Sequence, residues 1–73
     1  SQERSLEILK RILDVLKESL EILKESLSIL RQLASRIKNP NRKIEEILKE
    51  SDKIIKESDK VLKEIEEVIR YSS

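Results

Sequence analysis

Aliphatic residues recur along residues 6–37 at steps that alternate between three and four, and this spacing is unbroken. The residues at these steps are Leu6, Leu9, Leu13, Leu16, Leu20, Leu23, Leu27, Leu30, Ala34 and Ile37. Such steps keep side chains on one face of an α-helix, whereas a half-buried strand needs steps of two. A seven-residue repeat of this length also predicts that the helix coils around a partner helix.

A second aliphatic stripe, interrupted by two Ser, runs along the same segment with the same alternation. Its members are Ile8, Ile12, Val15, Ser19, Ile22, Ser26, Ile29 and Leu33. The two stripes together cover about 160° of the helix surface, which is wider than the seam of a simple coiled coil. We therefore expect this helix to contact more than one neighbouring helix.

The chain is interrupted once, because it contains a single Pro and no Gly. Pro40 cannot continue a helix and disfavours helix at the residue before it, and Asn41 suits the N-cap of a following helix. We predict one helix over residues 2–38, a loop over 39–41 and a second helix over 42–71. The predicted fold class is all-α, a single domain that forms an antiparallel two-helix hairpin.

The second predicted helix has a narrower apolar stripe that fits the first one in antiparallel order. Its members are Ile44, Ile47, Leu48, Ile54, Ile55, Val61, Leu62, Ile65, Val68 and Ile69. In the best alignment Leu16 lies opposite Val61 and Leu23 lies opposite Ile54. Because apolar layers then meet apolar layers, this alignment predicts the pairing of the two helices.

Four Ser interrupt these stripes, and the same alignment brings them together in pairs. Ser19 lies opposite Ser58, and Ser26 lies opposite Ser51. We predict two buried polar layers whose hydroxyls bond across helices and disfavour shifted pairings. The alternative is that small side chains allow close helix approach while each hydroxyl bonds its own i−4 carbonyl.

The stripe on the far flank of the first helix is predicted to be an interface between chains. The predicted interface residues are Ile8, Val15, Ile22 and Ile29, together with Leu13, Leu20 and Leu27. A monomer would leave the first four in water, where continuous apolar patches are uncommon. Chains of about 70 residues rarely obtain more than ~3–5 kcal/mol from one core. Without Cys for disulfides, the remaining route to stability is assembly with copies of the same chain.

Other functions lack the residues that they require. The chain has no Cys and no His, and its 16 basic and 15 acidic residues leave a net charge of +1. We expect no metal, cofactor or small-molecule ligand, and no nucleic-acid partner. Ser35 and Lys38 match the S-x-x-K pattern of serine acyl-enzymes, but the other motifs of those enzymes are missing, so we expect no enzymatic activity. No apolar run approaches the ~20 residues that span a bilayer, and no secretory signal is present, which predicts a soluble protein without membrane association, made by recombinant cytoplasmic expression.

With its one Asn-Pro corner, copied heptads, Ile/Leu/Val core and lone Tyr71, the chain resembles de novo designed helical-hairpin homo-oligomers. That resemblance implies a symmetric bundle, or two concentric rings of helices around a water-filled channel. In the ring the first helix is the inner one, and its lumen-facing residues are Arg11, Ser28, Gln32 and Ser35. The alternatives are a homodimeric four-helix bundle, a trimeric six-helix bundle or one half of a designed heteromer.

Overall fold

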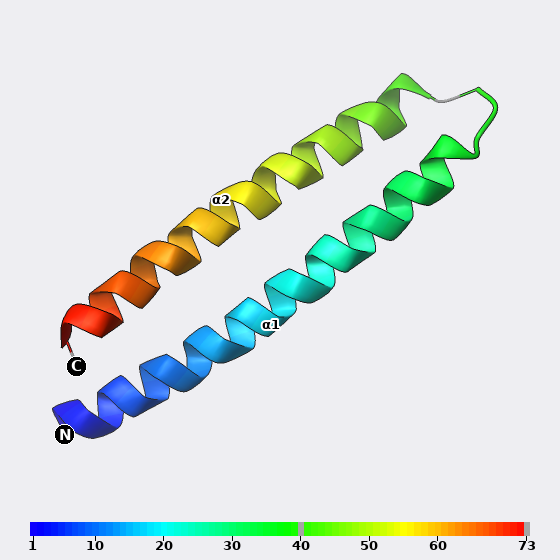
Figure 1. Ribbon diagram of the computed structural model, residues 1–73. Helices are drawn as coiled ribbons and strands as arrows, with labels where there is room; N and C mark the ends of the chain where they lie inside the picture. The colour runs from blue at the N-terminus through cyan, green and yellow to red at the C-terminus, as the bar shows by residue number, and fades with distance from the viewer. Residues whose placement is uncertain (40, 73) are drawn as a thin grey trace.

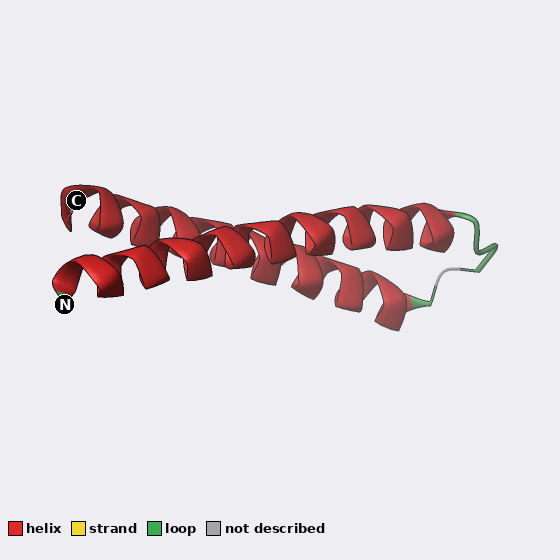
Figure 2. Ribbon diagram, turned by 90° about the horizontal axis from the view of Figure 1, so that it is seen from below, coloured by secondary structure: helices red, strands yellow, loops and turns green. Residues whose placement is uncertain are grey.

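The computed structural model describes residues 1–39 and 41–72, and it contains two long helices that run antiparallel (Figure 1). Helix α1 spans Gln2–Ser35 and helix α2 spans Arg42–Ser72, so both chain termini lie at the same end. Figure 2 shows the two helices crossing each other along their length. The predicted all-α hairpin is confirmed; Pro40, the middle of the predicted loop, and Ser73 lie outside the described residues.

Each helix begins at a side chain that accepts a hydrogen bond from an exposed backbone N–H. The Ser1 hydroxyl accepts from the Arg4 N–H at 3.3 Å, and the Asn41 Oδ1 accepts from the Lys43 N–H at 2.8 Å. The first N–H groups of a helix have no partner within it, so such caps define where it starts. The predicted capping role of Asn41 is confirmed, and that of Ser1 was not predicted.

Helix α1 ends at Ser35, three residues earlier than predicted. The N–H of Arg36 donates to the Leu33 carbonyl and the N–H of Ile37 donates to the Ala34 carbonyl, both at 3.1 Å. These bonds to the third residue back tighten the last turn instead of extending the helix. Helix α2 begins at Arg42, so the connection between the helices starts at Arg36.

The core of the hairpin is one seam of side chains between the helices. Leu13, Leu20 and Leu27 of α1 and Leu62 and Ile69 of α2 are 5–9% exposed. They recur at seven-residue steps on each helix, as expected for helices that coil around each other. Two partly buried residues, Leu6 and Ile55, extend the seam.

This core is thin for the length of the molecule. The Cα trace measures 57 × 15 × 13 Å, so each helix has only one neighbour. Only five side chains are buried, whereas 17 large hydrophobic side chains among the described residues are at least 37% exposed. The arrangement of these exposed side chains defines the candidate site.

Candidate functional site

The hairpin has an apolar face on one side of the core seam. An open groove of about 470 Å³ runs between the helices on this side. It is lined by Leu16, Ser19, Leu20, Leu23, Ile54, Glu57, Ser58, Val61, Leu62 and Ile65. We call this surface the open groove. The pairs aligned from the sequence, Leu16 with Val61 and Leu23 with Ile54, line it together, yet each of these side chains stays 43–58% exposed.

Beside the open groove, α1 carries a further row of exposed aliphatic side chains. The row consists of Ile8, Val15, Ile22 and Ile29, which are 48–62% exposed. We call these four residues the isoleucine flank. Their seven-residue spacing places them on one line along α1, turned further from α2 than Leu16 and Leu23. Both surfaces therefore belong to one wide apolar band on α1.

Three of the predicted interface residues lie elsewhere. Leu13, Leu20 and Leu27 were predicted at a contact between chains, but the structure places them inside the hairpin and leaves 5–7% of each exposed. This column of α1 lies next to the side chains that form ion pairs with α2. These leucines therefore have little surface left for a second chain.

The four Ser are not buried within one hairpin. Ser51 and Ser58 are half-buried and Ser19 and Ser26 are exposed, because the core seam uses the neighbouring leucine column. The hydroxyls of Ser26 and Ser51 donate to the carbonyls four residues back, each at 2.8 Å. For these two Ser the structure shows the local hydrogen bond, not the predicted bond across helices. Ser19 and Ser58 line the open groove from its two sides.

The predicted lumen residues are all exposed on α1. The Ser35 hydroxyl donates to the Gln32 carbonyl at 2.7 Å. Ser28 lines a shallow hollow together with Lys24, Arg31 and Asp52, so it borders the charged side of the hairpin. In the single chain, all four predicted lumen positions are exposed to solvent, and Arg11 is one of them.

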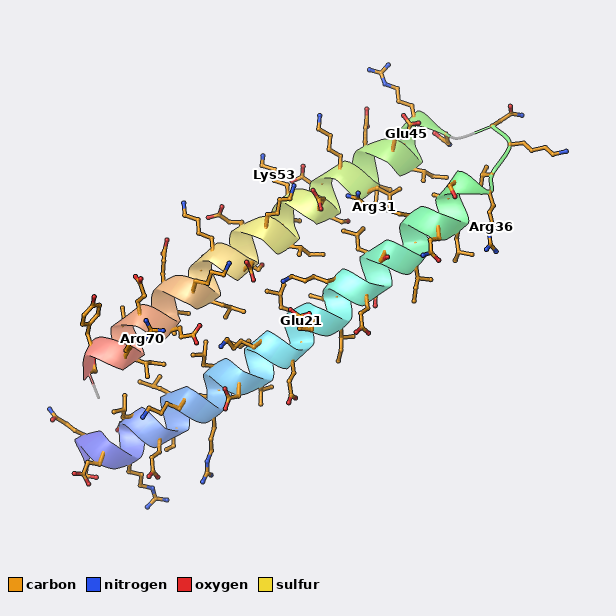
Figure 3. All side chains as sticks on the ribbon, in the orientation of Figure 1. Glu21, Arg31, Arg36, Glu45, Lys53 and Arg70 are labelled. Atoms are coloured by element: carbon orange, nitrogen blue, oxygen red, sulfur yellow. The ribbon has the colours of Figure 1, made fainter. Side chains whose placement is uncertain are left out.

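On the other side of the core seam, ion pairs join the two helices. Basic residues of α1 and acidic residues of α2 meet at seven-residue steps, and Figure 3 shows Arg31 extending from α1 toward α2. The pairs are Lys17–Glu66 at 2.9 Å, Lys24–Asp59 at 3.3 Å and Arg31–Asp52 at 3.3 Å. We call this surface the ion-pair face. It covers one side of the leucine seam with charge and makes that side unsuitable for apolar contacts.

The acidic members of this face also bind lysines of their own helix. Asp59 contacts Lys63 at 3.0 Å, and Asp52 contacts Lys56 at 2.9 Å. Hydrogen bonds from Lys63 and then Lys24 lower the pKa of the Asp59 carboxyl below its ordinary value. A hydrogen bond from Lys56 does the same to the pKa of Asp52.

The pKa of Glu66 is lowered by its hydrogen bond from Lys17. Lys24 has a raised pKa because it donates to Glu21 and to Asp59. The interhelix pairs were missed in the sequence, although the signal is present there. Basic and acidic residues recur at matching seven-residue steps beside the leucine columns of the two helices.

Groups of three or more His, Cys, Asp or Glu placed to hold a metal ion do not occur within residues 1–39 and 41–72. Within the same ranges, neither helix is long and apolar enough to cross a membrane. Comparison with protein-family models, curated proteins and solved structures found no match. The candidate site is thus the apolar surface formed by the open groove and the isoleucine flank.

Proposed function

We propose that this chain is a structural protein whose function is to assemble with copies of itself. The observation that carries the proposal is the pair of apolar surfaces, the open groove and the isoleucine flank, which one hairpin leaves exposed. Soluble monomers rarely expose contiguous apolar patches of more than a few hundred Å². Both surfaces consist mainly of Leu, Ile and Val at seven-residue steps. The apolar stripe on one copy can therefore pack against an apolar stripe with the same spacing on another copy.

The arrangement that we propose is a closed ring with α1 inside and α2 outside. Helix α1 has two apolar surfaces, whereas the exposed aliphatic residues of α2 form a single stripe, of which Ile54, Val61 and Ile65 line the groove. A helix with two apolar surfaces contacts neighbours on both sides, which suits the inner position. The polar side of α1, which carries Arg11, Ser28, Gln32 and Ser35 and borders the ion-pair face at Ser28, then lines a water-filled channel.

A compact homodimer is the second candidate, because both helices contribute to the open groove. Two grooves packed against each other would give a four-helix bundle. A de novo designed origin is part of the proposal for either arrangement. It is supported by the restricted set of core residues and by the absence of Gly, Phe, Met, Cys and Trp.

The test is the mass of the assembly in solution at micromolar concentration, by light scattering or sedimentation. We expect one species at an integral multiple of the 8.6 kDa chain mass. More than two chains supports the ring, and two chains supports the four-helix dimer. A folded species of 8.6 kDa would overturn self-assembly, and an unfolded or polydisperse chain would indicate one half of a heteromer.

A matched pair of variants locates the interface. Leu23→Glu places a charge in the open groove, where Leu23 is 55% exposed in the single chain, and should reduce the mass. Lys53→Glu changes an exposed residue on the outer side of α2 and should leave the mass unchanged. An unchanged mass for Leu23→Glu would show that the groove is not covered by another copy.

The channel is tested through Ser28→Cys, since the chain has no Cys of its own. In the ring this thiol faces a confined lumen, so small maleimides should react faster than bulky ones. In the compact dimer it lies on the outer surface, and the size of the reagent should have little effect. Equal relative rates for small and bulky reagents, after correction with a free thiol, would contradict the channel.

A further inference from the structure

We infer that the isoleucine flank of one copy packs into the open groove of the next copy, so that copies join head to tail. This inference rests on the proposed self-assembly and specifies the surfaces that meet. The occupant of the groove is thus a second copy of this chain, and in particular its helix α1.

The first argument is the size of the isoleucine flank. Four aliphatic side chains bury no more than about 500 Å² even when completely covered. A stable protein interface buries ~800 Å² on each partner. Two flanks packed against each other would therefore bury too little apolar surface on both partners. Packing the flank into the open groove adds the aliphatic side chains that line the groove to one side of the contact.

The second argument is the shape of the groove. Its floor is formed by Leu20 and Leu62 of the core seam, and its lining also includes Ser19 from α1 and Ser58 from α2. The aliphatic neighbours of these Ser in the same columns are Ile12 and Ile65. The two small side chains widen the groove at its centre, which makes room for the branched side chains of Val15 and Ile22 from another copy.

The third argument is the charge along the free edge of α2. Glu57 lines the groove on this edge, and Glu50 and Glu64 follow at seven-residue steps on either side, all exposed. If two grooves packed face to face, two arrangements would be available. With α1 beside the partner's α1, the Glu rows of the two α2 helices would face each other. With α1 beside the partner's α2, the isoleucine flank would pack against Glu, which is costly to bury.

Head-to-tail packing keeps the Glu rows of two copies apart. The isoleucine flank enters the groove beside Glu57, which lies at the exposed edge of the groove, so its carboxylate can stay in solvent. The two surfaces that meet are different, so each copy keeps one flank and one groove available for further copies. Contacts of this kind close into rings when the rotation between neighbours allows it. The inference therefore favours the ring over the two-fold dimer.

Crosslinking with mixed single-Cys chains tests the inference, since the unmodified chain has no Cys. An affinity-tagged Ile22→Cys chain is unfolded with an untagged Ser58→Cys chain, refolded as a mixture and treated with a short bis-maleimide. Val15→Cys serves as a second flank position, and Lys53→Cys replaces the flank variant as the control. We expect tagged–untagged dimers to form at least about tenfold faster than the control pair, because neighbours hold the thiols at high effective concentration.

The outcomes distinguish a contact between flank and groove from a contact between two flanks. Tagged–tagged dimers in Ile22→Cys alone, formed as fast as in the mixture, would show that flank meets flank and would overturn the inference. Absence of mixed crosslinks with both flank positions, in an assembly of unchanged mass, would also overturn it while leaving self-assembly intact. A chain that sediments as a monomer would instead remove the proposed function itself.

Discussion

The Lys24 ammonium lies 3.3 Å from the Asp59 carboxylate on the opposite helix, and the other oxygen of the same carboxylate lies 3.0 Å from Lys63. Asp59 is therefore shared by a lysine from each helix. Arg31, Asp52 and Lys56 repeat the arrangement seven residues away on each helix. The repeat coincides with that of the leucine seam, so charge and burial favour the same pairing of α1 with α2.

Reversal of the Asp59 charge is expected to weaken the hairpin. Asp59→Lys places a cation between Lys24 and Lys63 and should lower the melting temperature measured by circular dichroism. The double variant with Lys24→Glu restores an opposite pair across the helices and should recover part of the loss. Because the groups are partly exposed, the effect should shrink as salt is added. A double variant no more stable than Asp59→Lys would show that the pair does not couple the helices.

Acid should destabilise the fold through the carboxylates of the ion-pair face. The folded-state pKa of Asp59 lies below its ordinary value of 3.8, first because of Lys63 and then because of Lys24, so the folded state binds this proton less readily than the unfolded state. The resulting stabilisation is complete above the unfolded pKa and is lost as pH falls through the folded pKa. The pKa values of Asp52 and Glu66 are also lowered in the folded state, so these two carboxylates add stabilisation that is lost in acid in the same way.

The measurement is the free energy of unfolding in urea at pH values between about 6 and 2. A variant with Asp52→Asn, Asp59→Asn and Glu66→Gln should be less stable near neutral pH and should change less with acid. The raised pKa of Lys24 matters at the alkaline end of the pH range. Its contribution to the free energy of unfolding is lost as pH rises above 10.5 and through the folded pKa. Equal acid dependence of the variant and the unmodified chain would assign the effect to other carboxylates.

A comparison of Leu20 with Leu23 separates the core of the hairpin from the contact between copies. Leu20 is 5% exposed in one chain, and Leu20→Ala should cost about 2–5 kcal/mol. Leu23 is 55% exposed, so Leu23→Ala would cost within about 0.5 kcal/mol in a monomer. If another copy covers the groove, Leu23→Ala should cost several-fold more and the cost should depend on protein concentration. Urea unfolding at two concentrations measures both, and a small, concentration-independent effect for Leu23→Ala would contradict a covered groove.

The helices follow directly from the sequence, because unbroken steps of three and four, the absence of Gly and one Pro leave few alternatives to two helices. The sequence does not show, however, which column of side chains on α1 is buried against α2. The apolar band of α1 is wide enough for α2 to pack against several columns, and the apolar pattern alone does not choose among them. The structure chooses the column of Leu13, Leu20 and Leu27, next to the basic residues that meet Asp52, Asp59 and Glu66. A prediction based on apolar spacing alone therefore did not place these leucines in the seam within the hairpin.

The end of α1 shows a second limit of the sequence. Pro40 sets only the last residue at which α1 can stop. The helix ends earlier, where the N–H groups of Arg36 and Ile37 bond to carbonyls three residues back. For the Ser, spacing placed all four in apolar columns but could not give the partners of their hydroxyls. That choice depends on local geometry, in which a carbonyl four residues back is always within reach.

The last prediction concerns the two kinds of Ser. The hydroxyls of Ser26 and Ser51 bond carbonyls of their own helices, so Ser26→Ala with Ser51→Ala should change neither the mass of the assembly nor its melting temperature by much. Ser19 and Ser58 instead leave room at the centre of the open groove. Ser19→Leu with Ser58→Leu should keep the hairpin helical, since Leu favours helix, but should fill the groove and exclude the neighbouring copy. We therefore expect a smaller mass by light scattering with unchanged helicity by circular dichroism. A Leu variant that keeps one sharp mass and melts higher would show that Ser19 and Ser58 do not make room for another helix, and a Leu variant of mixed masses would indicate that they select the pairing between copies.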